Sequence, residues 1–543
     1  MKLDLIQNLL AGQSPASASM APPAPVVPID SFASYGARLE PTAGYVIPVL
    51  PSGPFTLRPF QAAAVETALS FKRVILGHQP GMGKTPIMHA VIAALKGTGP
   101  VVAVVPPALR TDPWQTLIAA WGWPIRYHVV EGRKRAPIPT GFDLYIVGDS
   151  VVSPRLADLQ ALRPVAVFGD EAHRYKSTTA QRSRAFRHLA EGTYETKDAN
   201  GKVVWHQAGY TPEYVVISTG TLAVNNADEV YMPVRALGAP IMRQICGGTY
   251  LRDFRDRYVI MKSVWTGRKS ILVPERSKNI DQLQAALRAN AYIRVSRDEV
   301  GGWPNKGLIT SNLALNGALT TYKRMESNFI AWIAEHKGAK AAERASRAEA
   351  LVQLGALWQA AGIAKVEAVT DYAEGLISQG EQVVVFAHHT EVIGAITSAL
   401  EANGRHVGNI IGGMNSDRKA NIIANFQAGK LDAIVANHVA GGEGITLDKA
   451  ANLIMAQLPW SPGLFVQASD RIYRITQTRN VLIHVLNAAD TVDTTMWDVL
   501  NDKASVVDQI NGAARGISIP DEQTGAEERS VQAAVLAKYG WED

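Results

Sequence analysis

The chain has 543 residues, of which 47% are hydrophobic and 19% charged, a composition typical of a folded protein with about two to four domains. Its net charge of +5 is small for this length, so it permits a nucleic-acid partner without requiring one. The single cysteine, Cys246, excludes an intrachain disulfide and a cysteine-based zinc cluster, and the sequence has no apolar run long enough to cross a bilayer. We therefore expect no membrane association and a cytoplasmic location.

Residues 1–40 are expected to form a flexible tail and linker, because residues 13–30 are rich in serine, alanine and proline. This tail is also a candidate docking peptide for a protein partner. Over residues 41–238, short apolar runs alternate with helical patterns, which predicts a parallel sheet covered by helices on both faces. The predicted strands of this first lobe are Val74–Leu76, Val101–Val105, Leu144–Val147, Val165–Phe168 and Val215–Ile217.

The next part of the chain, residues 239–308, is polar and rich in arginine, and we predict a mostly helical insertion there. Residues 309–376 are predicted to continue as long helices, broken at Gly338 and Gly362, that lead to a second lobe over residues 377–512. The strands predicted in this lobe are Val383–Phe386, Gly408–Ile411, Ala433–Ala436, Leu453–Met455 and Val481–Leu486. A charged tail, residues 513–543, follows. Two such blocks predict an α/β fold with two nucleotide-handling lobes.

A glycine-rich segment, residues 77–85, reads G-H-Q-P-G-M-G-K-T and lies between a predicted strand and a predicted helix. This arrangement is the phosphate-binding loop of nucleoside triphosphatases, although an ordinary glycine-rich turn is the alternative. Gly81 and Gly83 let backbone N–H groups bend around phosphate oxygens. Lys84 can reach the outer phosphates, and the Thr85 hydroxyl can ligate magnesium. The expected cofactors are therefore a nucleoside triphosphate, such as ATP, and Mg²⁺.

An acidic pair, Asp170 and Glu171, follows another predicted strand and begins the tetrapeptide D-E-A-H. Asp170 would hold magnesium through water, and Glu171 would polarise the attacking water. Such tetrapeptides also occur on solvated helix faces. The position of this one, at a strand end downstream of a phosphate loop, favours the catalytic interpretation.

A second-lobe pair of arginines, Arg471 and Arg474, is spaced so that one helix face would carry both. Their guanidinium groups could neutralise charge that builds on the γ-phosphate. A solvated helix face is the usual explanation of such a pair, but Gln467, Asp470 and Gln477 fall at similar spacing and weaken it. We therefore expect ATP to lie between the lobes, with Gln467, Arg471 and Arg474 completing the site on closure.

Together with other motifs in the same order, these segments resemble the Swi/Snf-type DNA translocases of helicase superfamily two, over about residues 55–510. The segment F-A-H-H, Phe386–His389, resembles the subgroup of HepA-related annealing helicases. The remaining motifs that carry the resemblance are Leu57–Gln61, Val104–Trp114, Asp170–Lys176, Ile217–Asn226, Ile411–Phe426, Ala440–Leu447 and Gln467–Gln477. The resemblance implies two RecA-like P-loop lobes with parallel sheets, plus helical insertions between them.

The resemblance also implies roles for single residues. The implied nucleotide-binding residues, with Gln61 reading the adenine, are Arg58, Gln61, Gly81, Met82, Gly83, Lys84, Thr85, Gly442 and Glu443. The residues implied to couple hydrolysis to movement are His173, Ser218, Thr219 and Thr221. The implied nucleic-acid contacts, mostly to phosphates and so with little base specificity, are Pro107, Arg110, Ser150, Thr219, His388, Asn437 and His438.

From the resemblance we predict an ATP hydrolase that translocates on duplex or branched DNA and remodels or anneals strands. One alternative is a strand-separating helicase on DNA or RNA. Another is an ATP-gated nucleic-acid scaffold without turnover, which the presence of Lys84, Glu171, Arg471 and Arg474 disfavours. The expected partner is DNA, duplex, forked or single-stranded, bound without sequence preference. We expect a monomer and, from the compactness of the motor, a bacterial or phage-infected cell.

An insertion within the first lobe, Glu195–Trp205, has Asn200-Gly201 at its centre. Asn-Gly between two short runs of strand formers is a strong hairpin signal, because both residues tolerate positive φ. The predicted ribbon carries Lys197 and Lys202 near its tip and an aromatic at its base. It could lie against a duplex or wedge at a strand junction, or it could merely pad the lobe.

Overall fold

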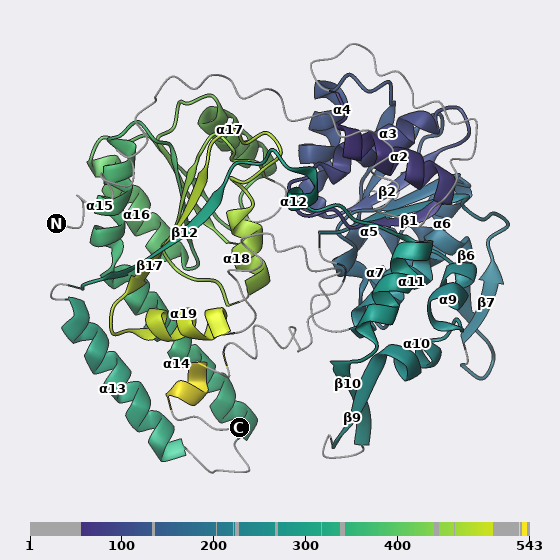
Figure 1. Ribbon diagram of the computed structural model, residues 1–543. Helices are drawn as coiled ribbons and strands as arrows, with labels where there is room; N and C mark the ends of the chain where they lie inside the picture. Colours follow the sequence, from purple (N-terminus) through teal and green to yellow (C-terminus); the bar gives the residue numbers. More distant parts are fainter. Residues whose placement is uncertain are drawn as a thin grey trace.

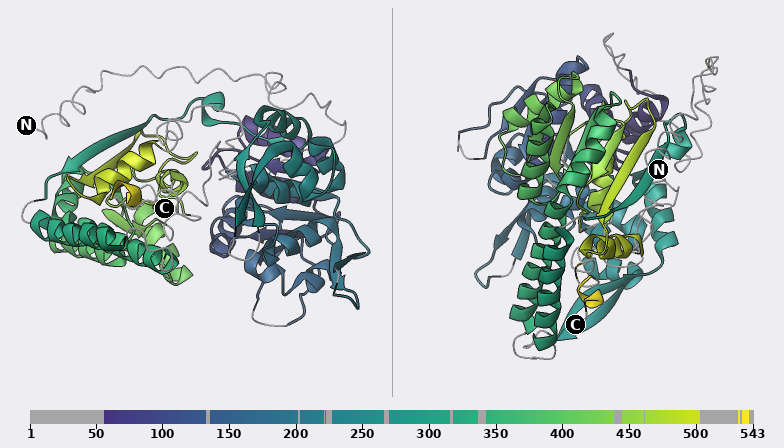
Figure 2. Two further views of the ribbon diagram at one scale, coloured as in Figure 1. Left: turned by 90° about the horizontal axis from the view of Figure 1, so that it is seen from below. Right: turned by 90° about the vertical axis from the view of Figure 1, so that its left-hand side faces the viewer.

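The protein is described here by a computed structural model, which covers residues 56–132, 136–201, 203–220, 222, 227–265, 270–315, 318–336, 343–438, 445–460, 462–502, 532 and 535–539. The expected tail and linker, residues 1–40, lie outside these ranges, as does most of the expected C-terminal tail. The described residues form two α/β lobes side by side (Figures 1 and 2). None of the described helices has the length and apolar character that a membrane crossing requires.

The first lobe contains a seven-stranded sheet with the order β11-β1-β8-β5-β2-β4-β3, in which every neighbouring pair is parallel. All of the apolar runs predicted as strands of this lobe are confirmed. The edge strands β3 and β11 were not predicted, because one is only half-buried and the other is two residues long. The strands are β1 (Arg73–Leu76), β2 (Val101–Val105), β3 (Tyr127–Val130), β4 (Leu144–Gly148), β5 (Ala166–Gly169), β8 (Tyr214–Ser218) and β11 (Tyr292–Ile293).

Helices cover both faces of this sheet, because successive side chains of each strand point to opposite sides. Val74 and Leu76 of β1 pack in one core, whereas Ile75 packs in the other. The first core involves α2 (Pro59–Phe71), α3 (Lys84–Ala94) and α4 (Thr116–Ala120). The second involves α5 (Asp149–Val152), α6 (Leu156–Ala161), α7 (Gln181–Glu191), α8 (Tyr231–Ala236), α9 (Ala239–Cys246), α10 (Leu251–Tyr258) and α11 (Ile280–Asn290).

The second lobe contains a six-stranded parallel sheet with the order β12-β17-β16-β13-β15-β14. Its strands are β12 (Lys306–Leu313), β13 (Val383–Ala387), β14 (Val407–Ile410), β15 (Ala433–Asn437), β16 (Asn452–Met455) and β17 (Val481–Ala488). One core contains α15 (Val366–Ile377) and α16 (Thr390–Ala402). The other contains α13 (Ala318–His336), α14 (Glu343–Ala364), α17 (Ser416–Gln427), α18 (Pro462–Ser469) and α19 (Val492–Asp502). The strands predicted in this lobe are confirmed.

The segment between the lobes differs from its prediction. Residues 239–308 are not mostly helical, because β9 (Val259–Trp265) and β10 (Ser270–Ser277) form an antiparallel hairpin there. Residues 309–376 begin within β12, which pairs with β17 at the edge of the second sheet. The chain therefore crosses between the lobes at residues 301–305. The prediction failed because an edge strand is only partly buried and β12 lacks a continuous apolar run.

Two further predictions concerned glycines as helix breakers. Gly362 lies inside α14, so the break predicted there is wrong, and Gly338 falls outside the described residues. A Cβ at residue 362 would lie 2.5 Å from Nε2 of Gln457. The glycine therefore serves a close contact between a helix and a side chain, and the helix continues through it.

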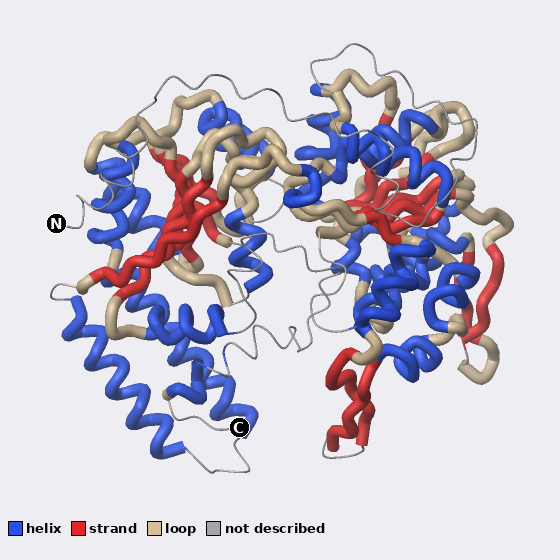
Figure 3. The backbone as a smooth tube through the Cα atoms, in the orientation of Figure 1, coloured by secondary structure: helices blue, strands red, loops and turns tan. Residues whose placement is uncertain are grey.

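The ribbon predicted at Asn200-Gly201 is confirmed. β6 (Thr193–Lys197) and β7 (Val203–Gln207) pair antiparallel, with Lys197 opposite Val203, and Gly201 has a φ of 75°. Figure 3 shows this ribbon at the outer side of the first lobe and the β9–β10 hairpin projecting from the same lobe.

Candidate active site

Three functional segments begin at the carboxyl ends of β1, β8 and β5, which lie at the same side of the first sheet because these strands are parallel neighbours. Leu76 at the end of β1 is paired with Ser218, and Gly169 at the end of β5 is paired with Ile217. The phosphate loop, the acidic pair and the end of β8 therefore start at the same level of the sheet.

The phosphate loop has the backbone that its glycines were expected to allow. Gly81 and Gly83 have φ values of 79° and 77°, in the left-handed region that favours glycine. Gln61 of α2 donates from Nε2 to the carbonyls of Met82 (3.1 Å) and Gly83 (3.4 Å). A Cβ on Gly83 would lie 2.4 Å from the same nitrogen. The structure thus brings together Gln61, Gly83 and the fully buried Met82, three of the residues predicted to bind nucleotide.

The lysine of the loop is held by the loop's own backbone. Nζ of Lys84 donates to the carbonyl of His78 (2.9 Å) and lies 3.4 Å from that of Gln79. Burial lowers the pKa of Lys84 to about 8, although Glu171 and Asp170 act to raise it. Thr85 follows in the first turn of α3, where the helix N-terminus adds positive partial charge.

The first carboxylate of the acidic pair is buried in a hydrogen-bonded position. Oδ2 of Asp170 accepts from Nε1 of Trp114 (2.9 Å), and Oδ1 accepts from the hydroxyl of Ser218. Burial and then the charge of Glu171 raise the pKa of Asp170. Glu171 has a φ of 54°, a left-handed conformation that is costly for a residue with a side chain and is concentrated at functional sites.

The oxygen donors of this site suit a magnesium ion. Mg²⁺ is bound through one or two protein oxygens together with water and phosphate oxygens, and Asp170 and Thr85 supply a carboxylate and a hydroxyl. A cation beside Asp170 would also stabilise the buried charge that burial and Glu171 disfavour. The described residues contain no cluster of three or more His, Cys, Asp or Glu that could hold a metal.

The two arginines do not share a helix face, so that prediction is wrong. α18, which carries Gln467, ends at Ser469, and turns follow it. The guanidinium groups nevertheless meet at one carbonyl, that of Ile445, with N–O distances of 3.0 Å for Arg474 and 3.4 Å for Arg471. Arg471 also donates from Nε to the carbonyl of Gln467 (3.1 Å).

The arginine-bearing segment touches the phosphate loop of the other lobe. The N–H of Ile475 donates to the carbonyl of Gly81 (3.1 Å), and Arg58 donates to the carbonyl of Ile475 (2.7 Å). A Cβ on Gly81 would lie 3.3 Å from Cδ of Arg474. The expected meeting of Arg474 with the phosphate loop is therefore present in the structure.

A cavity of about 730 Å³ adjoins the phosphate loop between the lobes. Its walls include Arg58, Gln61 and Gly83 from the first lobe, residues 475–478 from the second lobe, and the rings of Trp121 and Trp303. A volume of this size and an aromatic lining are typical of small-molecule sites. The cavity is therefore the candidate site for the base of a nucleotide, and two of the predicted nucleotide-binding side chains line it.

The predicted nucleic-acid residues of the first lobe lie near one another, with one exception. Pro107 is exposed, and its carbonyl accepts from Nε of Arg110 (3.4 Å). Both residues lie near Gly148, which is two residues before the exposed Ser150. Thr219 is fully buried, and its N–H donates to the carbonyl of Leu76 (3.0 Å). Its side chain is therefore not at the surface.

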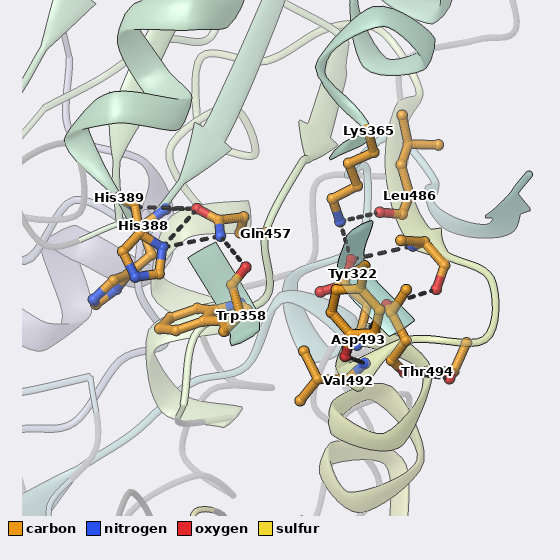
Figure 4. Close-up of polar contacts among 12 residues, drawn as sticks. Tyr322, Trp358, Lys365, His388, His389, Gln457, Leu486, Val492, Asp493 and Thr494 are labelled. Carbon is orange, nitrogen blue, oxygen red and sulfur yellow. Dashed lines mark hydrogen bonds and ion pairs between the residues drawn. The ribbon is translucent and has the colours of Figure 1, made fainter. Parts of the chain in front are cut away.

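Of the corresponding residues of the second lobe, His388 lies in a hydrogen-bond network around Gln457 (Figure 4). The carbonyl oxygen of this side chain accepts from the N–H groups of His388 (3.0 Å) and His389 (3.1 Å). Asn437 donates to the carbonyl of His388 (2.6 Å). His438 is 1% exposed, and burial lowers its pKa to about 3, so its predicted contact with nucleic acid does not fit this conformation.

Some predicted positions cannot be placed. Thr221, Gly442 and Glu443 fall outside the described residues. The backbone of His173 lies in the turn Ala172–Tyr175, but its side chain is not among the described ones.

Besides Trp121 and Trp303 of the cavity wall, Arg297 in the short helix α12 (Arg297–Val300) was not predicted from the sequence. Its N–H donates to Oε1 of Gln79 (2.9 Å), and its guanidinium donates to the carbonyl of Pro80. The available signal was the Ser296–Glu299 capping box, which marks a helix start, but a capping box says nothing about what the helix contacts.

Comparisons with known proteins agree with these motifs. Residues 364–476 match the family model of the helicase conserved C-terminal domain. The chain is 26% identical over 463 residues to the mouse DNA annealing helicase and endonuclease ZRANB3, which covers 83% of this chain and 40% of that protein. It is 26% identical over 479 residues to the SWI/SNF-related matrix-associated actin-dependent regulator of chromatin subfamily A-like protein 1 of Xenopus tropicalis, covering 86% and 46%.

A solved structure also aligns, the Sulfolobus solfataricus SWI2/SNF2 ATPase core in complex with dsDNA, at 19% identity and a TM-score of 0.40 over 90% of this chain and 99% of that chain. The chain spans less than half the length of the two curated relatives named above.

Proposed function

We propose that this chain, a relative of the Swi/Snf-type proteins of helicase superfamily two, hydrolyses ATP and uses the energy to move along DNA. The observation that carries the proposal is the meeting of two sets of groups. The phosphate loop and the pair Asp170–Glu171 start at one sheet edge, and the segment with Arg471 and Arg474 reaches that loop from the other lobe.

The groups present can divide the chemistry of hydrolysis among them. Glu171 takes the proton of the attacking water, and Lys84 neutralises the outer phosphates. Arg471 and Arg474 stabilise the charge of the transition state, after leaving the Ile445 carbonyl that they contact here. A magnesium ion held by Thr85 and Asp170 would supply further charge neutralisation on the phosphates.

DNA is the polymer along which we propose that the protein moves. The two relatives named above are described as a DNA annealing helicase and endonuclease and as a SWI/SNF-related regulator of chromatin, and this chain matches 40% and 46% of their lengths. The proposed contacts are the exposed Pro107 and Ser150 and the half-buried Arg110 on the first lobe, with His388 and Asn437 on the second lobe. We propose that the motor tracks duplex or branched DNA as a monomer and remodels or anneals strands. A protein partner could dock on residues 1–40.

The experiment that tests this proposal is ATP turnover with single-stranded DNA, duplex DNA, forked DNA and RNA compared side by side. We expect duplex or forked DNA to give the largest stimulation. Stimulation by RNA or by single strands alone would favour a strand-separating helicase, and ATP binding without turnover on any substrate would favour a scaffold.

A further inference from the structure

The segment that carries the two arginines, residues 470–475, is fastened to the phosphate loop at both ends. At one end, the N–H of Ile475 donates to the carbonyl of Gly81 (3.1 Å). At the other end, Asp470 forms an ion pair with Arg297 (3.1 Å), whose guanidinium also donates to the carbonyl of Pro80. Two consecutive carbonyls of the loop therefore hold the two ends of one segment from the other lobe.

Arg297 is well placed to act between the lobes, because α12 directly precedes the crossing at residues 301–305 (Figure 1). Its side chain is 7% exposed. The guanidinium carbon lies 4.7 Å from the ring centroid of Tyr473 and 5.2 Å from that of Trp303. Trp303 also lines the 730 Å³ cavity beside the phosphate loop. A base bound in that cavity would thus lie beside Trp303, whose ring also lies beside the Arg297 guanidinium.

Asp470 forms an ion pair with a residue on each side of the crossing between the lobes. Its second partner is Lys306, the first residue of β12, at 2.8 Å. Burial alone would raise the pKa of Asp470, but Arg297 and Lys306 lower it to about 2, so the carboxylate stays ionised. The residues before and after the crossing therefore both hold the base of the arginine segment.

We propose that Arg297 is a positioning residue for ATP hydrolysis. Its side chain fixes the position of the Arg471–Arg474 segment relative to the phosphate loop. This inference rests on the proposed function. A planar guanidinium can bind a carbonyl and a carboxylate at once, whereas a lysine ammonium has no such fixed fork. Both arginines contact Ile445 here, so they must turn to reach a phosphate, and Arg297 keeps the base of their segment in place as they do.

The first test compares wild type, Arg297→Lys and Arg297→Met in the full chain, measuring kcat and the Kd for ATP separately. Arg297→Met should lower kcat on the order of 10- to 100-fold, as expected for misplaced catalytic groups, and change the Kd far less. Arg297→Lys should fall between the two. A loss of ATP affinity at unchanged kcat in Arg297→Met would overturn the inference.

A matched control shows whether the loss of any buried ion pair has this effect. Lys365 pairs with Asp493 in the second lobe, is 1% exposed, and also donates to the carbonyl of Leu486 (2.7 Å) (Figure 4). Lys365→Met should lower the Tm, because it leaves Asp493 buried without this partner, but kcat below the Tm should stay near that of wild type. A comparable fall of kcat in both variants would assign the effect of Arg297→Met to destabilisation and overturn the inference.

The double variant Arg297→Met with Arg474→Ala isolates the positioning role. If Arg297 acts through the two arginines, Arg297→Met should lower kcat less in the Arg474→Ala background than in wild type, because only Arg471 is left to be positioned. Multiplied effects would overturn the inference. A fall of kcat in Arg474→Ala with wild-type kcat in Arg297→Met would overturn this inference alone, whereas unchanged kcat in Arg474→Ala would overturn it together with the proposed role of the arginines.

Discussion

At the scale of single residues, Glu171 is the proposed base that takes the proton of the attacking water. Glu171→Gln keeps the size of the side chain but removes its basicity, so ATP binding should persist while kcat falls on the order of 10²- to 10⁴-fold. Nucleotide binding and steady-state turnover, measured on the same preparation, check this. Glu213→Gln is a suitable control, because Glu213 is 51% exposed and pairs with Lys72 outside the site. Near-native turnover in Glu171→Gln would remove the assignment.

Lys84 gives the site a predictable pH dependence. Its pKa in the nucleotide-free protein is lowered to about 8 by burial, so the lysine loses its proton as the pH rises from 7 to 9. ATP binds the charged form better, and its affinity should therefore fall over this range. In Lys84→Arg the charge persists, and the slope should flatten even if the affinity itself is lower. Calorimetric titration at several pH values measures both slopes, and parallel curves would contradict the prediction.

At the scale of elements, the β6–β7 ribbon differs in detail from its sequence-based interpretation. Trp205 lies 4.0 Å from the guanidinium of Arg187 and 4.8 Å from the ring of His188, so it anchors one face of the ribbon to α7. On the other face Tyr194 stacks on His206 at 4.9 Å and is 39% exposed. Trp205 is itself 46% exposed, so both faces of the ribbon carry aromatic surface that could meet DNA, and Tyr194 is the part that can be removed without losing the anchor to α7.

Deleting the ribbon tests whether it contacts DNA. Replacing residues 196–206 by a short Gly-Ser link should leave turnover without DNA intact, because no proposed catalytic residue lies there. If the ribbon meets DNA, forked-DNA processing and DNA-stimulated turnover should fall several-fold, since one base–aromatic stack contributes about 1–3 kcal/mol. Tyr194→Ala, which keeps the Trp205 anchor, should give part of the loss. Unchanged DNA responses in both variants would show that the ribbon only pads the lobe.

The elements that the sequence predicted well are those whose pattern has one physical cause. Buried central strands such as β2 and β13 need continuous apolar runs, and the phosphate loop needs glycines at positive φ, so both could be found by reading residues. β12 and the β9–β10 hairpin could not, because partly exposed strands carry polar residues that fit a helix equally well. The roles of Arg297 and Gly362 depend on partners far away in the chain, which no local pattern shows.

At the scale of the whole molecule, the proposed DNA contacts are to phosphates and lie on both lobes. Binding should therefore weaken steeply with salt and depend little on sequence. Affinities for two unrelated duplexes at several salt concentrations measure this. A flat salt response, or a strong preference for one duplex, would count against a motor that tracks any DNA.

Movement along the duplex can be measured by the displacement of a third strand from a triplex. A motor that tracks duplex DNA should release the third strand only with ATP, from a site distant from its loading point, and Glu171→Gln should release none although it still binds DNA. Vigorous DNA-stimulated hydrolysis by the wild type with no ATP-dependent displacement of the third strand would contradict the account.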